Sequence, residues 1–238
     1  MHRRQYVITV LGSAVLAGPG VAHAGRDRSG EERPDSNTGD RRQTEPTTPT
    51  PESEGFGPRT FSGTGTSTSA EFDLRRGPIT ATFSAEERGS FTTQLLAVEG
   101  ESYDDVYLTI LLAPVEGSQV ASVNVDGSHV LNVETDGAWE ITLEQPSDST
   151  AQRLPVEATG SGPGYVDVVA FDGVVRVAGT HRGSSSFIVE TVPVDPDEFG
   201  ELVFAETGQF DGETTVRVDG PSYVNVDADG DWTLSFGT

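Results

Sequence analysis

The sequence predicts an all-β protein with two tandem homologous β-sandwich domains of jelly-roll-like type, placed after a signal peptide and a disordered linker. Three observations predict this class. Short runs of alternating apolar residues are separated by Gly, Pro and Asp turns. No segment after residue 24 has helical periodicity. One stretch, residues 127–143, is repeated at residues 220–236. Many short strands with regular turn signals are typical of sandwiches and jelly rolls.

The repeated stretch predicts the same β-hairpin in both halves of the chain. A three-residue loop, Thr135-Asp136-Gly137, keeps the apolar residues before and after it on one face, and it pairs Val133 with Trp139. In the second half the same register pairs Val226 with Trp232. The residues that match at a constant offset of 93 include Gly127 with Gly220, Asn132 with Asn225, Asp136 with Asp229, Gly137 with Gly230 and Trp139 with Trp232.

These patterns predict a first domain over residues 60–145, a linker over 146–155 and a second domain over 156–238. Further matches at an offset of 96, such as Phe91 with Phe187, support the duplication. The strands expected in the first domain are 69–75, 78–84, 90–97, 105–113, 118–125, 128–134 and 138–144. Those expected in the second are 165–171, 174–180, 185–192, 201–207, 213–218, 222–228 and 231–236.

Residues 1–24 are predicted to be a targeting segment rather than part of the fold. Arg3-Arg4-Gln5-Tyr6-Val7 resembles the twin-arginine export signal, and a short apolar run follows it. Ala22-His23-Ala24 matches a small-x-small cleavage site, so we expect cleavage before Gly25. Pro19 stands where a lipidated Cys would be needed, which argues against a lipid anchor. The apolar run over residues 7–17 is too short to span a bilayer, so we expect no membrane insertion after cleavage.

Residues 25–59 are rich in Gly, Pro, Thr, Ser, Glu and Arg, with Phe56 as the only large apolar residue. Such a segment buries too little surface to offset its ordering entropy, so the sequence predicts a disordered linker. Its Pro/Thr stretch over residues 44–51 is interpreted as a spacer, with O-linked sugars as the alternative.

The charge of the chain is extreme. The formal net charge is −23, and all 15 basic residues are Arg because the chain contains no Lys. Self-repulsion of this size is relieved in molar salt, where the Debye length is about 3 Å. The composition therefore favours a halophilic protein that loses its structure on dialysis to low salt; a merely acidic secreted protein would keep a cooperative melt in dilute buffer. So negative a surface is a poor partner for nucleic acid. The absence of Cys excludes disulfides and thiolate chemistry.

Taken together, the export motif, the Lys-free acidic composition, the Thr/Pro linker and the internal repeat resemble haloarchaeal twin-arginine-exported proteins of uncharacterised role. In those proteins an acidic stalk precedes β-sandwich repeats. The resemblance implies a secreted or cell-surface location, and it names no ligand.

One cluster of oxygen-bearing side chains suggests a cation site. In the predicted hairpin Asp227 lies across from Asp231, and like charges in that position are unfavourable unless a cation lies between them. With Asn225 and Asp229 they supply the ligand type that Ca²⁺ takes, so these four residues are the candidate metal ligands. Against the site, the bidentate Glu of a calcium loop is replaced by Phe236. Asp195-Pro196-Asp197-Glu198 with Glu201 is interpreted as a solvated acidic turn.

Signals for sugar stacking and for catalysis are weak. Each Trp shares a face with the apolar residues of its hairpin, which favours a core position over a sugar platform. The expected exposed aromatic residues are Tyr103, Tyr107, Tyr165 and Tyr223. After cleavage the only His residues are His129 and His181, and their matches in the other half are Ser222 and Ala85, so neither belongs to a duplicated site. The sequence thus predicts no catalytic residue and no cofactor, with Ca²⁺ left as a possibility.

The expected function is a non-catalytic binding or structural module of the cell envelope or extracellular space. Its partners would be an envelope polysaccharide or a surface protein, met through loops and exposed strands. The alternative is an extracellular hydrolase, acting on glycosides or peptides, or the accessory carbohydrate-binding domain of one, since 38 acidic residues leave carboxylate pairs open.

Overall fold

The computed structural model describes residues 57–102, 104–147 and 150–237. Within these ranges every regular element is a β-strand, which confirms the all-β class. The strands form two seven-stranded sheets, which belong to one compact unit. The predicted signal peptide, residues 25–56 of the predicted linker and Tyr103 lie outside the described residues.

The N-terminal sheet is built from the first seven strands. These are β1 (Arg59–Thr64), β2 (Ser67–Thr68), β3 (Phe72–Leu74), β4 (Gly77–Ala97), β5 (Val106–Val123), β6 (Gly127–Glu134) and β7 (Ala138–Glu144). The C-terminal sheet contains β8 (Gln152–Arg153), β9 (Val156–Ser161), β10 (Gly164–His181), β11 (Ser186–Pro193), β12 (Leu202–Thr207), β13 (Phe210–Ala228) and β14 (Asp231–Gly237). All pairings are antiparallel except that of the two-residue strand β8 with β10.

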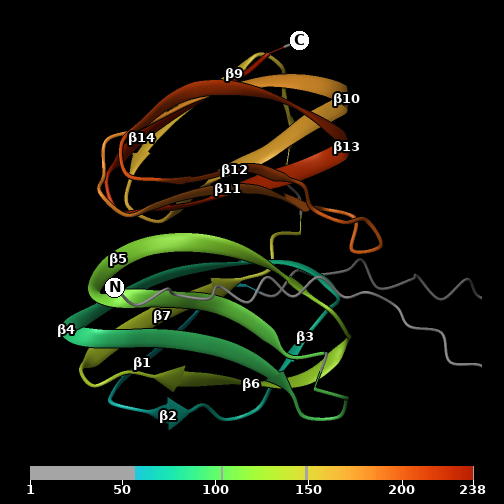
Figure 1. Cartoon of the computed structure of the whole chain (residues 1–238). Coiled ribbons are helices and arrows are strands. Elements are labelled where there is room, and N and C mark those ends of the chain that lie inside the picture. The colour runs from blue at the N-terminus through green and yellow to red at the C-terminus, as the bar shows by residue number, and fades with distance from the viewer. Residues whose placement is uncertain (1–56, 103, 148–149, 238) are drawn as a thin grey trace, which may run out of the picture. The chain divides into compact units, whose positions relative to one another are not determined.

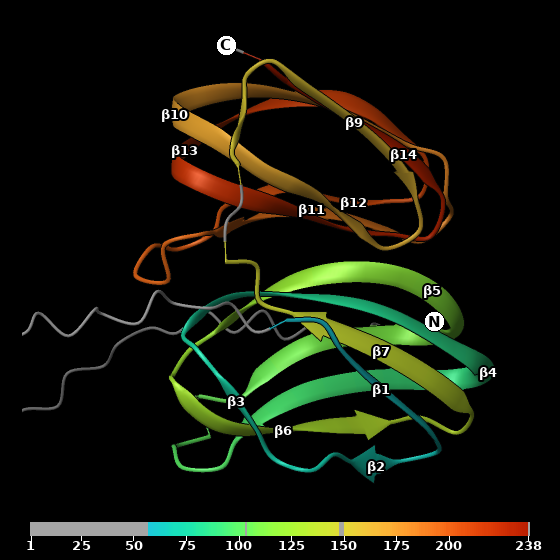
Figure 2. The ribbon, with the colours of Figure 1, turned by 180° about the vertical axis from the view of Figure 1, so that it is seen from behind.

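A long hairpin, β4–β5, organises the N-terminal sheet. The first half of β4 pairs with β7 from Thr80 to Ala85, and the second half pairs with β6 from Thr92 to Ala97. Between the halves the register shifts from Ala85 to Gly89, which bends the strand. Each sheet therefore curls so that its two halves face each other (Figures 1 and 2). The result is a sandwich-like fold whose layers share their longest strands.

The C-terminal sheet repeats these pairings with its long strands divided differently. The end of β10 pairs with β14 from Arg176 to His181, and β11 pairs with the end of β13 from Phe187 to Pro193. In place of the single strand β4 the C-terminal sheet thus has β10 and β11, joined by residues 182–185. The last strand of each sheet pairs with a short edge strand, β7 with β1 and β14 with β9.

The predicted hairpin between β6 and β7 is wrong. β6 pairs with β2, β3 and β4, whereas β7 pairs with β1 and β4, so the Thr135-Asp136-Gly137 loop carries the chain from one layer to the other. The same holds for β13 and β14. Val133 and Trp139 do share the core, as the alternation predicted, but from opposite layers. Alternation determines which side chains point inward, and it does not determine which strands exchange hydrogen bonds.

Several predicted strand boundaries are also wrong. Gly and Pro residues that were interpreted as turns lie inside long strands, namely Gly89 in β4, Pro114 in β5, Gly173 in β10 and Pro221 in β13. The edge strands β1 and β9 were missed because their sequences, RTFSGT and VEATGS, carry small or polar residues where strand patterns show large apolar ones.

Each of these edge strands has a glycine where a larger side chain would collide with a Trp ring. Gly63 of β1 lies opposite Trp139, and Gly160 of β9 lies opposite Trp232. A Cβ atom at Gly63 would stand 2.7 Å from the indole, and one at Gly160 would stand 2.3 Å from it. Each edge strand therefore leaves room for the Trp ring that closes its core. Each sheet encloses its own apolar cluster, around Phe91, Leu131 and Ile141 in one and Phe187, Val226 and Phe236 in the other.

Candidate functional site

Asn225, the first candidate metal ligand, holds the two sheets together instead. Its side chain is 8% exposed, on the outer face of β13. Its Oδ1 accepts a hydrogen bond from the Val120 backbone N–H at 2.8 Å, and its Nδ2 donates to the Val120 carbonyl oxygen at 2.6 Å. The amide thus pairs with β5 as a neighbouring strand would. Since β5 pairs on its other side with β4, Asn225 covers part of an open sheet edge.

The surroundings of Asn225 form a small apolar cluster between the sheets. Val168, Val192 and Tyr223 of the C-terminal sheet pack with Val120 of β5, with Ala151, Tyr165 and Val194 at its margin. The backbone N–H of Ser118 also donates to the Pro163 carbonyl oxygen at 3.1 Å. The segment of β5 that is covered, Gly117–Val123, contains no charged residue.

The other three candidate ligands do not converge. Asp227 pairs with Ile188 on β11, whereas Asp231 pairs with Ser161 on β9, so the two are not cross-strand neighbours. Asp229 lies in the turn between β13 and β14. Because the hairpin is absent, the like-charge pair that motivated the calcium site is absent as well. In the described parts of the chain, no group of three or more His, Cys, Asp or Glu side chains is arranged to hold a metal ion.

Asp227 nevertheless meets negative charge from other residues. Burial raises the pKa of its carboxyl, and the charges of Glu190 and Asp229 raise it further, against a hydrogen bond from the Ser186 side chain. The sequence predicted Asp231 as the acidic neighbour of Asp227. In the structure that neighbour is Glu190, on the adjacent strand β11, and only the strand order reveals it.

Asp229 fixes the loop between β10 and β11. Its carboxylate accepts hydrogen bonds from the backbone N–H groups of Ser184 and Ser185 at 2.9 to 3.1 Å, and from the Ser184 hydroxyl at 3.0 Å. Burial alone would raise the pKa of Asp229, but these hydrogen bonds, with a contribution from His181, hold it below the ordinary value. The carboxylate thus acts as an anchor for the backbone.

His181 lies next to Asp229 and is fully buried. It stacks on Phe187 at a centroid distance of 5.0 Å. Its Nδ1 donates to the Gly208 carbonyl oxygen at 2.7 Å, since a carbonyl can only accept. Its Nε2 lies 3.3 Å from Oδ1 of Asp229, without the geometry of a hydrogen bond. Because Ser184 contacts Asp229 and not the imidazole, these residues do not form the Ser–His contact of a nucleophilic site.

His129 and Ser222 occupy matching positions in the two halves of the chain, and both are fully buried. His129 pairs with Phe72 across β3, and Ser222 pairs with Val169 across β10. The His129 Nδ1 donates to the Gly127 carbonyl oxygen at 2.9 Å, while its Nε2 and the Ser222 hydroxyl have no hydrogen-bond partner in the structure. The sequence match therefore corresponds to a match in register.

The structure agrees with the predicted burial of some aromatic residues and disagrees with that of others. Trp139 and Trp232 are core residues, as predicted, and each indole N–H donates at 3.0 Å to a glycine carbonyl, of Gly65 and of Gly162. Tyr107 is exposed, as expected. Tyr223 is buried, so its predicted exposure is wrong. It does lie on the outer face of its sheet, but β5 covers that face.

Tyr165 also lies at the contact between the sheets and is only partly exposed, stacked edge-on against Tyr223 at 6.0 Å. Burial raises the pKa of its phenol, and the nearby Asp167 carboxylate raises it further. Two of the four expected exposed tyrosines therefore contribute to an internal contact.

Hydroxyl side chains form a row across each sheet that the sequence analysis did not detect. Thr60 of β1, Thr142 of β7 and Thr82 of β4 are register partners on three neighbouring strands, as are Thr159 of β9, Thr233 of β14 and Thr180 of β10. Adjacent hydroxyls hydrogen-bond at 2.9 Å between Thr60 and Thr142 and at 2.8 Å between Thr180 and Thr233. These two sets are called the hydroxyl rows. Strand pairing assembles them from distant positions, so single-strand patterns could not reveal them.

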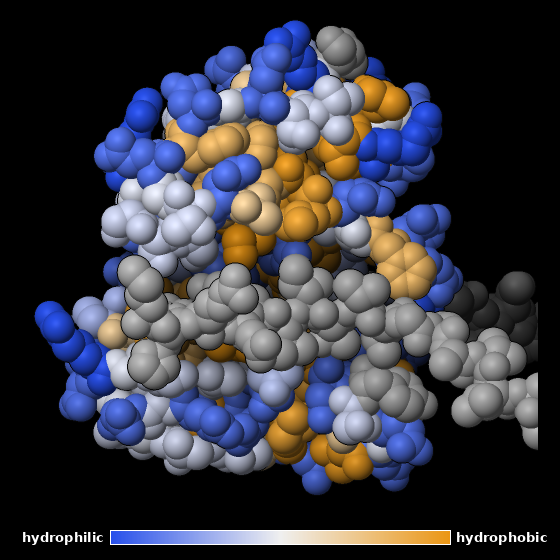
Figure 3. All heavy atoms as spheres, viewed as in Figure 1, coloured by the Kyte–Doolittle hydropathy of each residue, from blue (hydrophilic) through white to orange (hydrophobic). Residues whose placement is uncertain are grey.

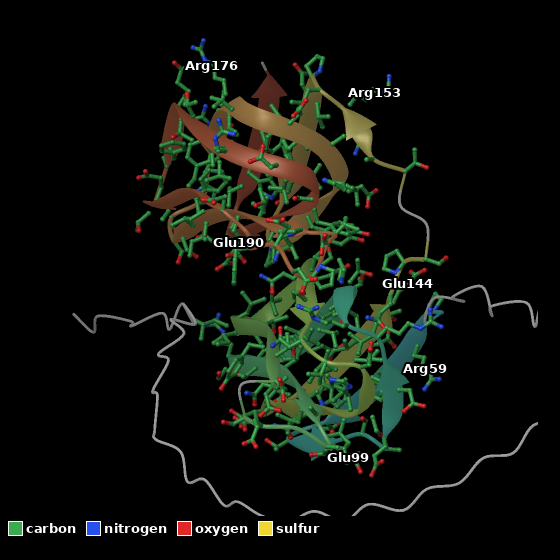
Figure 4. The ribbon with its side chains drawn as sticks, turned by 90° about the vertical axis from the view of Figure 1, so that its right-hand side faces the viewer. Arg59, Glu99, Glu144, Arg153, Arg176 and Glu190 are labelled. Atoms are coloured by element: carbon green, nitrogen blue, oxygen red, sulfur yellow. The ribbon has the colours of Figure 1, made fainter. Side chains whose placement is uncertain are left out.

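Charged side chains are spread over both sheets. Arg59, Glu99 and Glu144 belong to the N-terminal half, and Arg153, Arg176 and Glu190 to the C-terminal half (Figure 4). Arg176 pairs with Glu213, and this ion pair raises the pKa of the guanidinium. On the face shown in Figure 3, apolar patches interrupt a largely hydrophilic surface.

Comparisons with known proteins assign no family to the chain. No protein-family model matches the sequence, and a search of curated proteins finds no significant match. Among the described residues, no helix is long and apolar enough to cross a membrane.

Proposed function

We propose that this chain is an exported, halophilic binding or structural module of the cell envelope or extracellular space, and that it is not an enzyme. The observation that carries the proposal is the pair of hydroxyl rows. Each row presents hydroxyls at the regular spacing of neighbouring strands, about 4.8 Å apart. A surface of this kind suits a repetitive polyhydroxyl polymer, because each hydroxyl both donates and accepts hydrogen bonds.

The chemistry-bearing side chains support a non-catalytic role. His129, His181 and Ser222 are fully buried, and the carboxylate of Asp229 is engaged by loop hydrogen bonds. His129, His181 and Asp229 bond to backbone groups of strands and loops, and Ser222 is enclosed in the core. The predicted export signal and the acidic, Lys-free composition support a location outside the cell, where an envelope polysaccharide or a surface protein would be the partner.

Co-sedimentation of the purified protein with washed cell envelopes in molar salt tests the proposal. We expect saturable binding that persists in a variant lacking residues 25–56, which keeps β1 intact. Replacing one row (Thr60→Ala, Thr82→Ala, Thr142→Ala) or the other (Thr159→Ala, Thr180→Ala, Thr233→Ala) should weaken binding at least about threefold. The hydroxyls are lost while the apolar core is untouched.

The matched control is the double variant Thr207→Ala, Thr215→Ala, which removes exposed threonines outside the rows. Circular dichroism must show that all variants are folded. Absence of envelope binding by the wild-type protein would refute the envelope assignment, and binding unchanged in both row variants would refute the role of the hydroxyl rows. Turnover of a polysaccharide, ester or peptide substrate in a high-salt screen would refute the non-catalytic assignment.

A further inference from the structure

One outer surface of the N-terminal sheet is almost free of charge. Tyr107, Ile110 and Leu112 of β5 are 55%, 56% and 55% exposed, and Val98, just after β4, is 44% exposed. Their neighbours on the same side are uncharged: Gln94 pairs with Tyr107, Thr92 with Ile110 and Ser90 with Leu112. Leu96 pairs with Val130, and Gln94 also pairs with Asn132. We call this surface the neutral face: Ser90, Thr92, Gln94, Leu96, Val98, Tyr107, Ile110, Leu112, Val130 and Asn132.

The neutral face contrasts with the composition of the chain. The formal net charge is −23, whereas the acids paired along this face lie only at its border: Glu134 is opposite Thr92, and Asp73 of β3 is opposite Ser128, whose hydroxyl donates to Glu71. The strand segment from Val106 to Val115 contains no charged residue at all. Edge strands usually carry charges that discourage pairing with other chains, and this segment of β5 lacks them.

In the C-terminal sheet the corresponding residue pairs are covered by another strand. There Val192 pairs with Tyr223 and Glu190 pairs with Asn225, as Leu96 pairs with Val130 and Gln94 with Asn132 in the N-terminal sheet. Val192, Val194 and Tyr223 are packed against Val120, and Asn225 binds the backbone of an uncharged edge strand. The neutral face carries the corresponding residues Leu96, Val98, Val130 and Asn132, on a surface where Val98 remains exposed.

We propose that the neutral face binds the neutral face of a second copy of this chain, so that the protein is a two-fold symmetric dimer. The face contains both partners of the contact seen between the sheets: an uncharged edge segment, and an apolar surface with an asparagine, Asn132, whose Oδ1 also accepts a hydrogen bond from the Thr68 hydroxyl at 3.0 Å. A two-fold axis lets each copy supply both. Charge selects this face as well, because two copies that each carry −23 repel each other over any acidic surface.

Sedimentation velocity of the exported chain in molar salt tests the proposal, with Ile110→Glu as the disrupting variant and Val174→Glu as the matched control. Val174 lies on β10 and is 57% exposed, against 56% for Ile110. We expect the wild type and Val174→Glu to be dimeric. Ile110→Glu should raise the dimer dissociation constant at least about tenfold, because it buries an unpaired charge.

Cross-linking gives a second readout that does not depend on destabilising the interface. The chain contains no Cys, so a single introduced cysteine can be oxidised only to another copy. At least one of Ile110→Cys and Leu112→Cys should form an intermolecular disulfide rapidly, whereas Val174→Cys should not. The cross-linked species must sediment as a dimer with the far-ultraviolet circular dichroism of the wild type.

A wild-type protein that is monomeric in molar salt overturns the proposal, as does a dimer unaffected by Ile110→Glu or disrupted equally by Val174→Glu. A monomer that loses envelope binding on Ile110→Glu would assign the face to an envelope component and also overturn it. The proposal does not depend on the proposed function, because self-association is measured without envelopes and the hydroxyl rows lie on other strand segments.

Discussion

In the C-terminal sheet Val192 pairs with Tyr223 and both are buried, whereas in the N-terminal sheet Leu96 pairs with Val130 and both are partly exposed. The strands are paired in the same way in both sheets. The difference in exposure therefore arises from what packs on the outer face of each pair. Val120 of β5 packs over the first pair, and it does not belong to the surroundings of the second. The exposure of a side chain in this molecule therefore depends on what covers its strand as much as on the alternation of apolar residues along that strand.

The deepest shared feature is the Trp that closes each core, and removing it should have the largest effect. Trp139→Ala and Trp232→Ala should each destabilise the protein by about 3–5 kcal/mol, because each leaves a large cavity. Equal losses in chemical denaturation would show that the two cores are closed in the same way. Phe199→Ala, on an exposed aromatic residue outside both cores and outside the neutral face, is the control and should have little effect.

The two asparagines separate the covered face from the uncovered one. Asn225→Ala removes both partners of the Val120 backbone groups, and each buried group left unpaired costs about 1–3 kcal/mol. We therefore expect a loss of at least about 2 kcal/mol. Asn132→Ala, at the matching position, should cost under about 0.5 kcal/mol in the monomer. Similar losses in denaturant melts, with both substitutions made in the Ile110→Glu background so that dimer contacts do not contribute, would contradict the assigned difference between the faces.

The edge-strand glycines sharpen the comparison between the two cores. A Cβ atom would be 2.3 Å from the indole at Gly160 and 2.7 Å from it at Gly63, so both Gly→Ala variants must displace a packed ring. Overpacking of this kind costs about 1–3 kcal/mol, and we expect the larger loss for Gly160→Ala. Gly237→Ala is the control, because a Cβ atom there meets nothing within 4 Å. Thermal melts in molar salt would rank the three variants.

The contributions of Asp229 and Asp227 to the stability of the protein should depend on pH with opposite signs. The pKa of Asp229 is lowered in the folded state, so its ionised form stabilises the protein above the ordinary aspartate pKa, and that contribution disappears as pH falls through the lowered value. Asp229→Asn should therefore destabilise at neutral pH and flatten the acid limb of the stability curve.

Asp227 provides the counterpart in the same experiment. Burial, with the charges of Glu190 and Asp229, raises its pKa, so ionisation destabilises the folded state above that pKa. Asp227→Asn should leave the protein as stable as the wild type or slightly more stable near pH 7. A loss of stability on Asp227→Asn equal to that on Asp229→Asn would contradict the assigned signs.

The residues that face the core could be predicted from sequence because burial follows alternation within a single strand. Trp139, Ile141, Val226 and Leu234 are buried as their parity required. The sequence stretches that match between the two halves could also be recognised, and they have corresponding strand pairings in the structure. Such properties depend on neighbours close in sequence, so the sequence by itself determined them.

The tertiary structure alone decided which strands are partners. Alternation is the same whether consecutive strands share hydrogen bonds or face each other across a core, so the hairpin at Asp136 was predicted where the chain crosses between layers. The calcium hypothesis at Asp227 and Asp231 depended on that hairpin. The burial of Tyr223 and Asn225, and the hydroxyl rows, likewise depend on strands far apart in sequence. Contacts of this kind are set by the packing of the whole molecule, which no local pattern encodes.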